Sequence, residues 1–102
     1  MSYKWLLRDE WLDAIDAIGG PVRRDFYDLL FSLLENPFPD PNAEQDSRGI
    51  MPLKGFSEMA PEPRHFTAPF EGGFIAYDLP LDYPDRIRLI RVIHPDLPEG
   101  FV

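Results

Sequence analysis

The residues best suited to chemistry in this chain are basic and imidazole side chains, and they gather in its second half. Residues 48–102 contain both histidines, His65 and His94. A guanidinium or ammonium group binds phosphate oxygens, and an imidazole can give or take a proton near neutral pH. Such residues could hold a phosphate group and move a proton, and a local basic patch remains possible in this half. The candidate cations of this half are Lys54, Arg64, Arg86, Arg88 and Arg91.

Each candidate also has a plainer structural interpretation. Arg64 and His65, which are adjacent in sequence, either hold a phosphate and move a proton or form a solvated strand edge. Lys54 is either a phosphate contact or a surface lysine after a turn. His94 is either a proton-transfer group or a hydrogen-bonded histidine at the edge of the core. Tyr77 is either a substrate contact or a cross-strand packing residue.

Arg91 is set apart by strand alternation. Side chains alternate between the two faces of a strand, so Arg86 and Arg88 are predicted to share one face. Arg91 is predicted on the other face, together with Leu89 and Ile93. It then either reaches a substrate-binding face or forms an ion pair with an acid on a helix.

The carboxylates of the first half do not indicate a metal site. Asp13, Asp16, Asp25 and Asp28 fall on two helical segments with no histidine nearby in sequence. This distribution is typical of a solvated helix face. We expect neither a metal nor another cofactor.

Three extended runs position the candidate residues of the second half. Arg64–Phe70, Phe74–Leu79 and Arg86–His94 are rich in β-branched and aromatic residues. The turn signals Glu71-Gly72-Gly73 and Pro80–Asp85 separate them. The pattern predicts an antiparallel three-strand meander.

The first half predicts a strand followed by two helices. Residues 3–8 alternate as a short strand, which needs the meander as its partner. Asp9 is a plausible N-cap for a short helix that ends at Gly19-Gly20. Pro21 then starts a second helix, which stops at Asn36-Pro37. Its apolar stripe at helical spacing comprises Val22, Phe26, Leu29, Leu30, Leu33 and Leu34.

Together these elements predict an α+β fold of order β-α-α-β-β-β. The expected architecture is an antiparallel-rich sheet of about four strands with the helical hairpin packed on one face. Met51–Gly55 is expected to form only a brief extended piece. A chain of 102 residues is expected to form one domain, residues 1–102.

The bulk composition narrows the class of protein. The formal net charge of −8 argues against a general nucleic-acid binder, although the second half is closer to balance. Cysteine is absent, so disulfides and thiolate metal sites are excluded. No apolar run approaches the ~20 residues of a membrane span, and the start of the chain fits no signal peptide. We expect a cytoplasmic protein without a membrane partner.

Four short motifs occur in a characteristic order along the chain. They are Leu33-Leu34-Glu35-Asn36-Pro37, Pro52-Leu53-Lys54-Gly55, Tyr77 in the second meander run, and Val92-Ile93-His94. Their order and spacing over residues 3–95 resemble the RelE/ParE superfamily, the toxin halves of bacterial toxin–antitoxin pairs.

The resemblance implies a function and a set of partners. In that family a sheet with two helices on one face binds a partner antitoxin. RelE-like members enter the ribosomal A site and cut mRNA without a metal, by attack of the 2′-hydroxyl on the neighbouring phosphate. ParE-like members instead poison DNA gyrase. Basic residues on the sheet stabilise the anionic transition state of the nuclease reaction.

The resemblance also implies roles for particular residues. Lys54 matches the basic residue of the family's Pro-Leu-Lys-Gly box, and Arg64 lies where the family often has an arginine. Both would hold phosphate. His94 matches the histidine that often ends the last strand, so His65 or His94 would handle protons.

Two departures from the family pattern keep a second hypothesis open. Phe74 stands where the family usually has an arginine, and Pro95-Asp96-Leu97 follows His94 in place of an arginine or tyrosine. The second hypothesis is a non-catalytic protein-binding module on the same scaffold, such as a gyrase inhibitor or a degenerate toxin.

Overall fold

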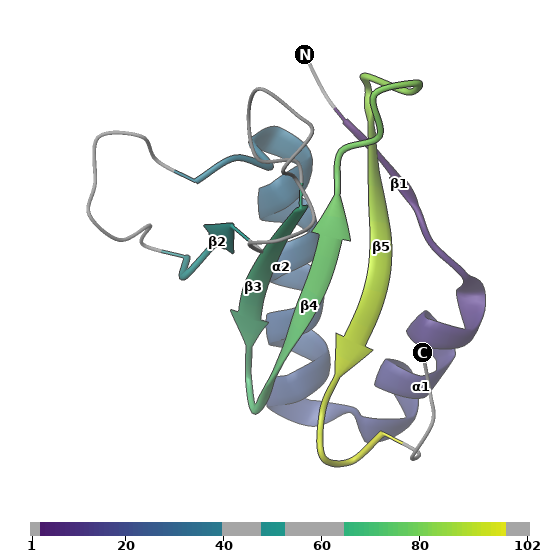
Figure 1. Cartoon of the computed structure of the whole chain (residues 1–102). Coiled ribbons are helices and arrows are strands. Elements are labelled where there is room, and N and C mark those ends of the chain that lie inside the picture. The colour runs from purple at the N-terminus through teal and green to yellow at the C-terminus, as the bar shows by residue number, and fades with distance from the viewer. Residues whose placement is uncertain (1–2, 40–47, 53–64, 98–102) are drawn as a thin grey trace.

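The chain folds into two helices and one mixed sheet, which confirms the α+β class (Figure 1). The computed structural model describes residues 3–39, 48–52 and 65–97. The order of elements along the described chain is β-α-α-β-β-β-β. Their bounds are β1 Lys4–Leu6, α1 Asp9–Ile18, α2 Gly20–Glu35, β2 Met51–Pro52, β3 His65–Phe70, β4 Gly73–Asp78 and β5 Arg86–Ile93.

The sheet has five described strands in the order β1-β5-β4-β3-β2, one more than the four expected. The additional strand is β2, which has only two residues. The meander β3-β4-β5 is antiparallel as predicted, and β1 adds to β5 in parallel. The predicted pairing of the N-terminal strand with the meander is thus confirmed, and it places β5 inside the sheet.

The two helices meet at a pair of glycines with positive φ. Gly19 has a φ of 68° and Gly20 a φ of 60°. Glycine enters this left-handed region at low cost, so the chain can reverse direction between the helices. Two predicted boundaries move by one residue. Arg8, not Asp9, is the N-cap of α1, and α2 begins at Gly20 rather than Pro21.

The helix α2 lies behind the sheet in the view of Figure 1, and α1 packs on α2 at the lower right, beside β5. Phe26 of α2 contacts Phe70 of β3 edge to face, with ring centroids 5.2 Å apart. The Trp5 indole donates a hydrogen bond to the Leu30 carbonyl at 3.0 Å, which fixes β1 to α2. Burial of such side chains stabilises the fold by about 1.5–3 kcal/mol each. We call the face under the helices the inner face.

Arg48 holds the C-terminal end of α2. Its guanidinium donates to the carbonyls of Asn36 at 2.7 Å and Phe38 at 2.9 Å, and to the Ser32 hydroxyl at 3.1 Å. The two carbonyls belong to the C-cap Asn36 and to Phe38 just after the helix, so Arg48 holds the segment that leaves α2 against its last turn.

A β-bulge in β5 overturns the predicted position of Arg91. Leu89 pairs with Tyr77 and Arg91 pairs with Ala76, so Ile90 is an extra residue in β5. The bulge interrupts the simple alternation of faces. Val92 therefore points inward at 2% exposure, while Arg91 is exposed on the face opposite Leu89.

Candidate functional site on the outer sheet face

The face of the sheet that the helices leave uncovered carries the candidate functional site, and we call it the outer face. The pairing register brings together there every second side chain of each strand, and the bulge adds one more from β5. Its members are Lys4 and Leu6 of β1, Met51 of β2, His65, Thr67 and Pro69 of β3, Phe74, Ala76 and Asp78 of β4, and Arg86, Arg88, Ile90, Arg91 and Ile93 of β5.

The centre of this site is a row of three polar side chains across three strands. His65 pairs in register with Asp78, and Asp78 pairs with Arg88. Arg88 donates two hydrogen bonds to Asp78, one of them from Nε to Oδ1 at 2.8 Å. The His65 Nε2 lies 3.6 Å from Asp78 Oδ2. The row therefore places an imidazole and a guanidinium on either side of one carboxylate.

Burial makes Asp78 the fixed member of this row. Its side chain is 4% exposed, whereas that of Arg88 is 55% exposed. The hydrogen bond to Asp78 raises the pKa of Arg88 above its usual value, although desolvation works in the opposite direction. Asp78 can orient His65 while both neighbours stay accessible to a ligand.

Charge is divided between the two layers of the molecule. The helices α1 and α2 contain seven acids and two arginines. The outer face, as the structure describes it, has the cations Lys4, Arg86, Arg88 and Arg91 and a single carboxylate, Asp78. The net charge of the whole chain thus conceals a basic sheet face that can attract an anion.

The structure brings His65 and Arg91 to the same face. Arg91 pairs with Ala76, one row away from Asp78 on that face. The two rows are about 7 Å apart along the strands. Lys54 and Arg64, the predicted phosphate-binding residues, lie outside the described residues.

His94 lies at the other end of the sheet from His65. His65 begins β3, and His94 packs at the turn that follows this strand, roughly 16 Å further along. Its Nδ1 accepts a hydrogen bond from the Asp96 amide at 3.1 Å, and its Nε2 lies 3.1 Å from the Glu71 carbonyl. A carbonyl only accepts, so the contact with Glu71 assigns a hydrogen to Nε2.

This environment ties His94 to the structure of the turn. Its side chain is 3% exposed and stacks on Phe70 with ring centroids 5.7 Å apart. Both ring nitrogens already have neighbours. The geometry thus separates His94 from the outer-face row.

Tyr77 is also buried away from the outer face. Its exposure is 0%, and its hydroxyl donates to the Pro37 carbonyl at 2.7 Å. The side chain joins β4 to the segment that follows α2. This position matches its interpretation as a packing residue.

Sequence reasoning missed Asp78, although a signal for it was present. The turn Glu71-Gly72 joins Phe70 to Gly73, and these two residues pair directly. Counting outward from that turn places Asp78 opposite His65. The sequence therefore already indicated that Asp78, an acid on a largely apolar strand, lies opposite His65.

Within the described ranges, no group of three or more His, Asp or Glu side chains is placed to hold a metal ion. No helix in those ranges is long and apolar enough to cross a membrane. Comparison of the chain with protein-family models, curated proteins and solved structures gives no match.

Proposed function

We propose that this chain is a RelE/ParE-type toxin that cleaves mRNA on the ribosome through its outer sheet face, under control of a partner antitoxin. The observation that supports the proposal is the row His65–Asp78–Arg88, with Arg91 in the next row of the same basic face. A cationic face next to an oriented imidazole suits an anionic substrate whose reaction requires a proton transfer.

In the proposed reaction the 2′-oxygen of one nucleotide attacks the adjacent phosphorus. The bond from phosphorus to the 5′-oxygen breaks, which leaves a 2′,3′-cyclic phosphate and a free 5′-hydroxyl. His65 takes the proton from the 2′-oxygen and passes it to the leaving 5′-oxygen. Arg88 and Arg91 stabilise the extra negative charge on the phosphate oxygens, and Lys54 and Arg64 are the further proposed phosphate contacts.

Induced expression in a bacterial host tests the proposal. We expect growth arrest and cleavage of translated mRNA, mapped by primer extension, and cleavage of mRNA on purified ribosomes when the purified chain is added. His65→Gln should lower the cleavage rate by about 10²–10⁴-fold, because it removes the proton-transfer group.

Arg23→Gln is the matched control, since Arg23 lies on α2 in a half-exposed ion pair with Asp16. It should cleave as the unchanged chain does. Intact mRNA during growth arrest, or full activity of the folded His65→Gln variant, would contradict the nuclease proposal.

A second candidate function is a non-catalytic binding module, of which a gyrase inhibitor is one version. The observation that favours it is apolar exposure on the outer face, where Phe74 and Ile90 are each 40% exposed and Ile93 is 37% exposed. Exposed apolar side chains among polar ones are typical of protein-binding surfaces. Growth arrest with an SOS response and intact mRNA would select this candidate.

A further inference from the structure

Phe74 is an aromatic side chain that β4 presents on the outer face of the sheet. It is 40% exposed, whereas the next residue, Ile75, is fully buried on the inner face. In the pairing register Phe74 lies between Pro69 of β3 and Ile93 of β5. Pro69 is exposed, and Ile93 is 37% exposed. An aromatic ring thus forms the centre of an apolar row that is open to solvent.

A guanidinium lies in the row next to Phe74. On β4 that row holds Ala76, which presents only a methyl group, and on β5 it holds Arg91, which is exposed. Rows on one face of a sheet are about 7 Å apart along the strands. A ligand with a flat ring and an adjoining phosphate can therefore contact the phenyl ring and the guanidinium together.

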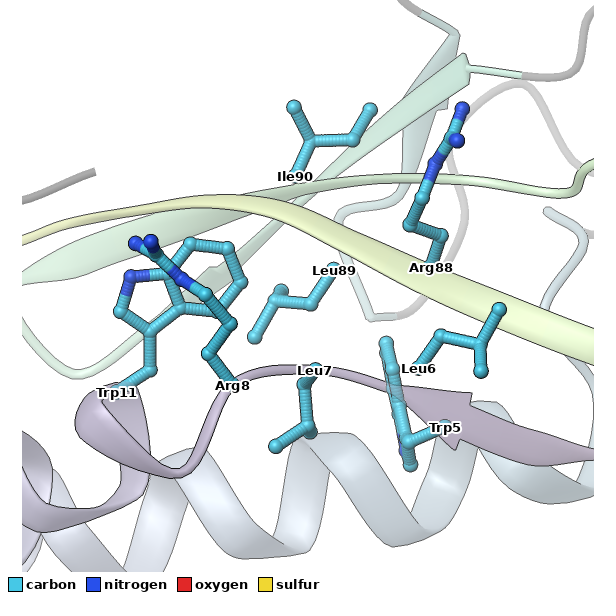
Figure 2. Close-up of a pocket in the computed structure, with 8 residues that line it drawn as sticks. All are labelled: Trp5, Leu6, Leu7, Arg8, Trp11, Arg88, Leu89 and Ile90. Carbon is cyan, nitrogen blue, oxygen red and sulfur yellow. The ribbon is translucent and has the colours of Figure 1, made fainter.

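The bulge residue extends the apolar surface toward a second guanidinium. Figure 2 shows Arg88 and Ile90 on the side of β5 that faces away from the helices, and Leu89 on the opposite side. Ile90 is 40% exposed. The side chain of Arg88 remains 55% exposed although it is bonded to Asp78. Cationic and apolar side chains thus alternate along the outer side of β5.

This combination is typical of surfaces that bind single-stranded nucleic acid. On such surfaces cations follow the phosphates, and exposed aromatic rings stack on the bases. A protein partner would need a carboxylate opposite each arginine, whereas a nucleotide chain has a phosphate beside every base. The single carboxylate of the face as the structure describes it, Asp78, is itself buried. The charge therefore favours an anionic chain with flat bases.

We propose that Phe74 stacks on one base of a single-stranded RNA while Arg91 contacts the adjoining phosphate. Phe74 and Asp78 are four residues apart on β4, or roughly 13 Å along the strand. The stacked base thus belongs to a nucleotide near the cleaved bond rather than at it. This inference rests on the RNA-cleaving function proposed for the outer face, and it adds a residue that holds the substrate in register.

A 2′-O-methyl oligoadenylate measures RNA binding without cleavage, since a methylated 2′-oxygen cannot attack phosphorus. Fluorescence anisotropy at low salt gives its affinity. Phe74→Leu should weaken binding about tenfold, because it removes the ring on which a base stacks. Phe74→Tyr keeps a ring and should retain most of the affinity. Phe31→Leu is the matched control and should bind as the unchanged chain does, because Phe31 is 63% exposed on α2 in the helical layer.

A probe without bases separates stacking from charge. An abasic ribose-phosphate oligomer of the same length has the same charge, and it should bind the unchanged chain about tenfold more weakly than the oligoadenylate. Phe74→Leu should not weaken this binding further. The salt dependence of oligoadenylate binding should also be the same for Phe74→Leu and the unchanged chain, since no phosphate contact is lost.

Three results would overturn the proposal. They are no binding of the oligoadenylate by the unchanged chain, unchanged affinity of the folded Phe74→Leu variant, and an equal loss of affinity for both probes in that variant. The second result would assign the apolar row to a protein partner. None of these measurements involves cleavage, so stacking and the proposed nuclease reaction can fail separately.

Discussion

At the scale of single residues, local partners determine which polar side chains can act on a ligand. His65 and His94 have the same side chain, but His94 is enclosed at a turn, whereas His65 faces outward beside a buried carboxylate. Similarly, Asp78 orients the guanidinium of Arg88, which stays 55% exposed, while Arg91 is exposed in the next row of the same face. The role of each residue follows from what surrounds it rather than from its type.

Tyr27 gives a pH-dependent prediction at this scale. Burial, and then the hydrogen bond that its hydroxyl donates to Asp16 at 3.1 Å, raise the pKa of Tyr27 above its usual value. Above about pH 10 the unfolded chain loses this proton before the folded chain does, so the free energy of unfolding falls as pH rises. Below about pH 10 the phenol is protonated in both states and contributes no pH dependence.

Urea denaturation between pH 9 and 11 measures this effect. Tyr27→Phe should flatten the decline in the midpoint over that range. Tyr83→Phe is the control, because Tyr83 is 58% exposed. Equal declines in the two variants would refute the assignment.

At the scale of elements, the β3–β4 turn depends on the absence of a side chain. A Cβ at Gly73 would lie 2.1 Å from the carbonyl oxygen of Ile93, across the β4–β5 pair. A Cβ at Gly20 would meet no atom within 4 Å, although the residue has a positive φ. The first glycine is thus required by packing, and the second only by backbone conformation.

Substitution by alanine should separate these two requirements. Gly73→Ala is expected to lower the free energy of unfolding by about 3 kcal/mol, because backbone rather than a flexible side chain must move. Gly20→Ala should cost about 1 kcal/mol, the cost of a left-handed conformation at an open position. Chemical denaturation measures both, and a larger loss at Gly20 would contradict this reasoning.

Arg48 supplies a second prediction at this scale. Arg48→Lys keeps the charge but loses the planar fork that reaches two carbonyls and the Ser32 hydroxyl, and should cost about 1–2 kcal/mol. Arg23→Lys, in a half-exposed ion pair, should change the stability by less than about 0.5 kcal/mol. Equal effects in urea denaturation would show that Arg48 contributes charge alone.

The sequence predicted the elements better than the relations between them. Periodicity located α2 and the meander, because the stripe from Val22 to Leu34 and the alternation around Ile75 are local signals. The bulge at Ile90 left no comparable signal, because both neighbouring residues are compatible with a strand. The row His65–Asp78–Arg88 depends on how three strands pair with one another. In the sequence, only the short turn between β3 and β4 carried information on that pairing.

At the scale of the whole molecule, the separation of charge determines how the protein meets an anionic polymer. The acids lie on α1 and α2, while the outer face presents cations. Each phosphate contact made by a cation releases counterions, so the logarithm of affinity falls with the logarithm of salt concentration. The slope of that line counts the contacts.

Arg91→Gln should reduce the slope for a single-stranded RNA by about 0.7, the value for one phosphate contact on a single strand. Arg24→Gln should leave the slope unchanged, because Arg24 belongs to the acidic helical layer. Fluorescence anisotropy at several salt concentrations measures both. Equal slopes for the two variants would remove Arg91 from the proposed RNA-binding face.

The extra residue at Ile90 shifts every later residue of β5 by one position in its pairing with β4. A strand that kept Ile90 but paired without the bulge would follow strict alternation, which would turn Arg91 toward the helices and Val92 toward solvent. Deletion of Ile90 would instead keep Arg91 outward and Val92 inward, because the strand would then alternate without a bulge. A relative that lacks the bulge would have one residue fewer in this strand, so its alignment with this chain must allow a gap at this point.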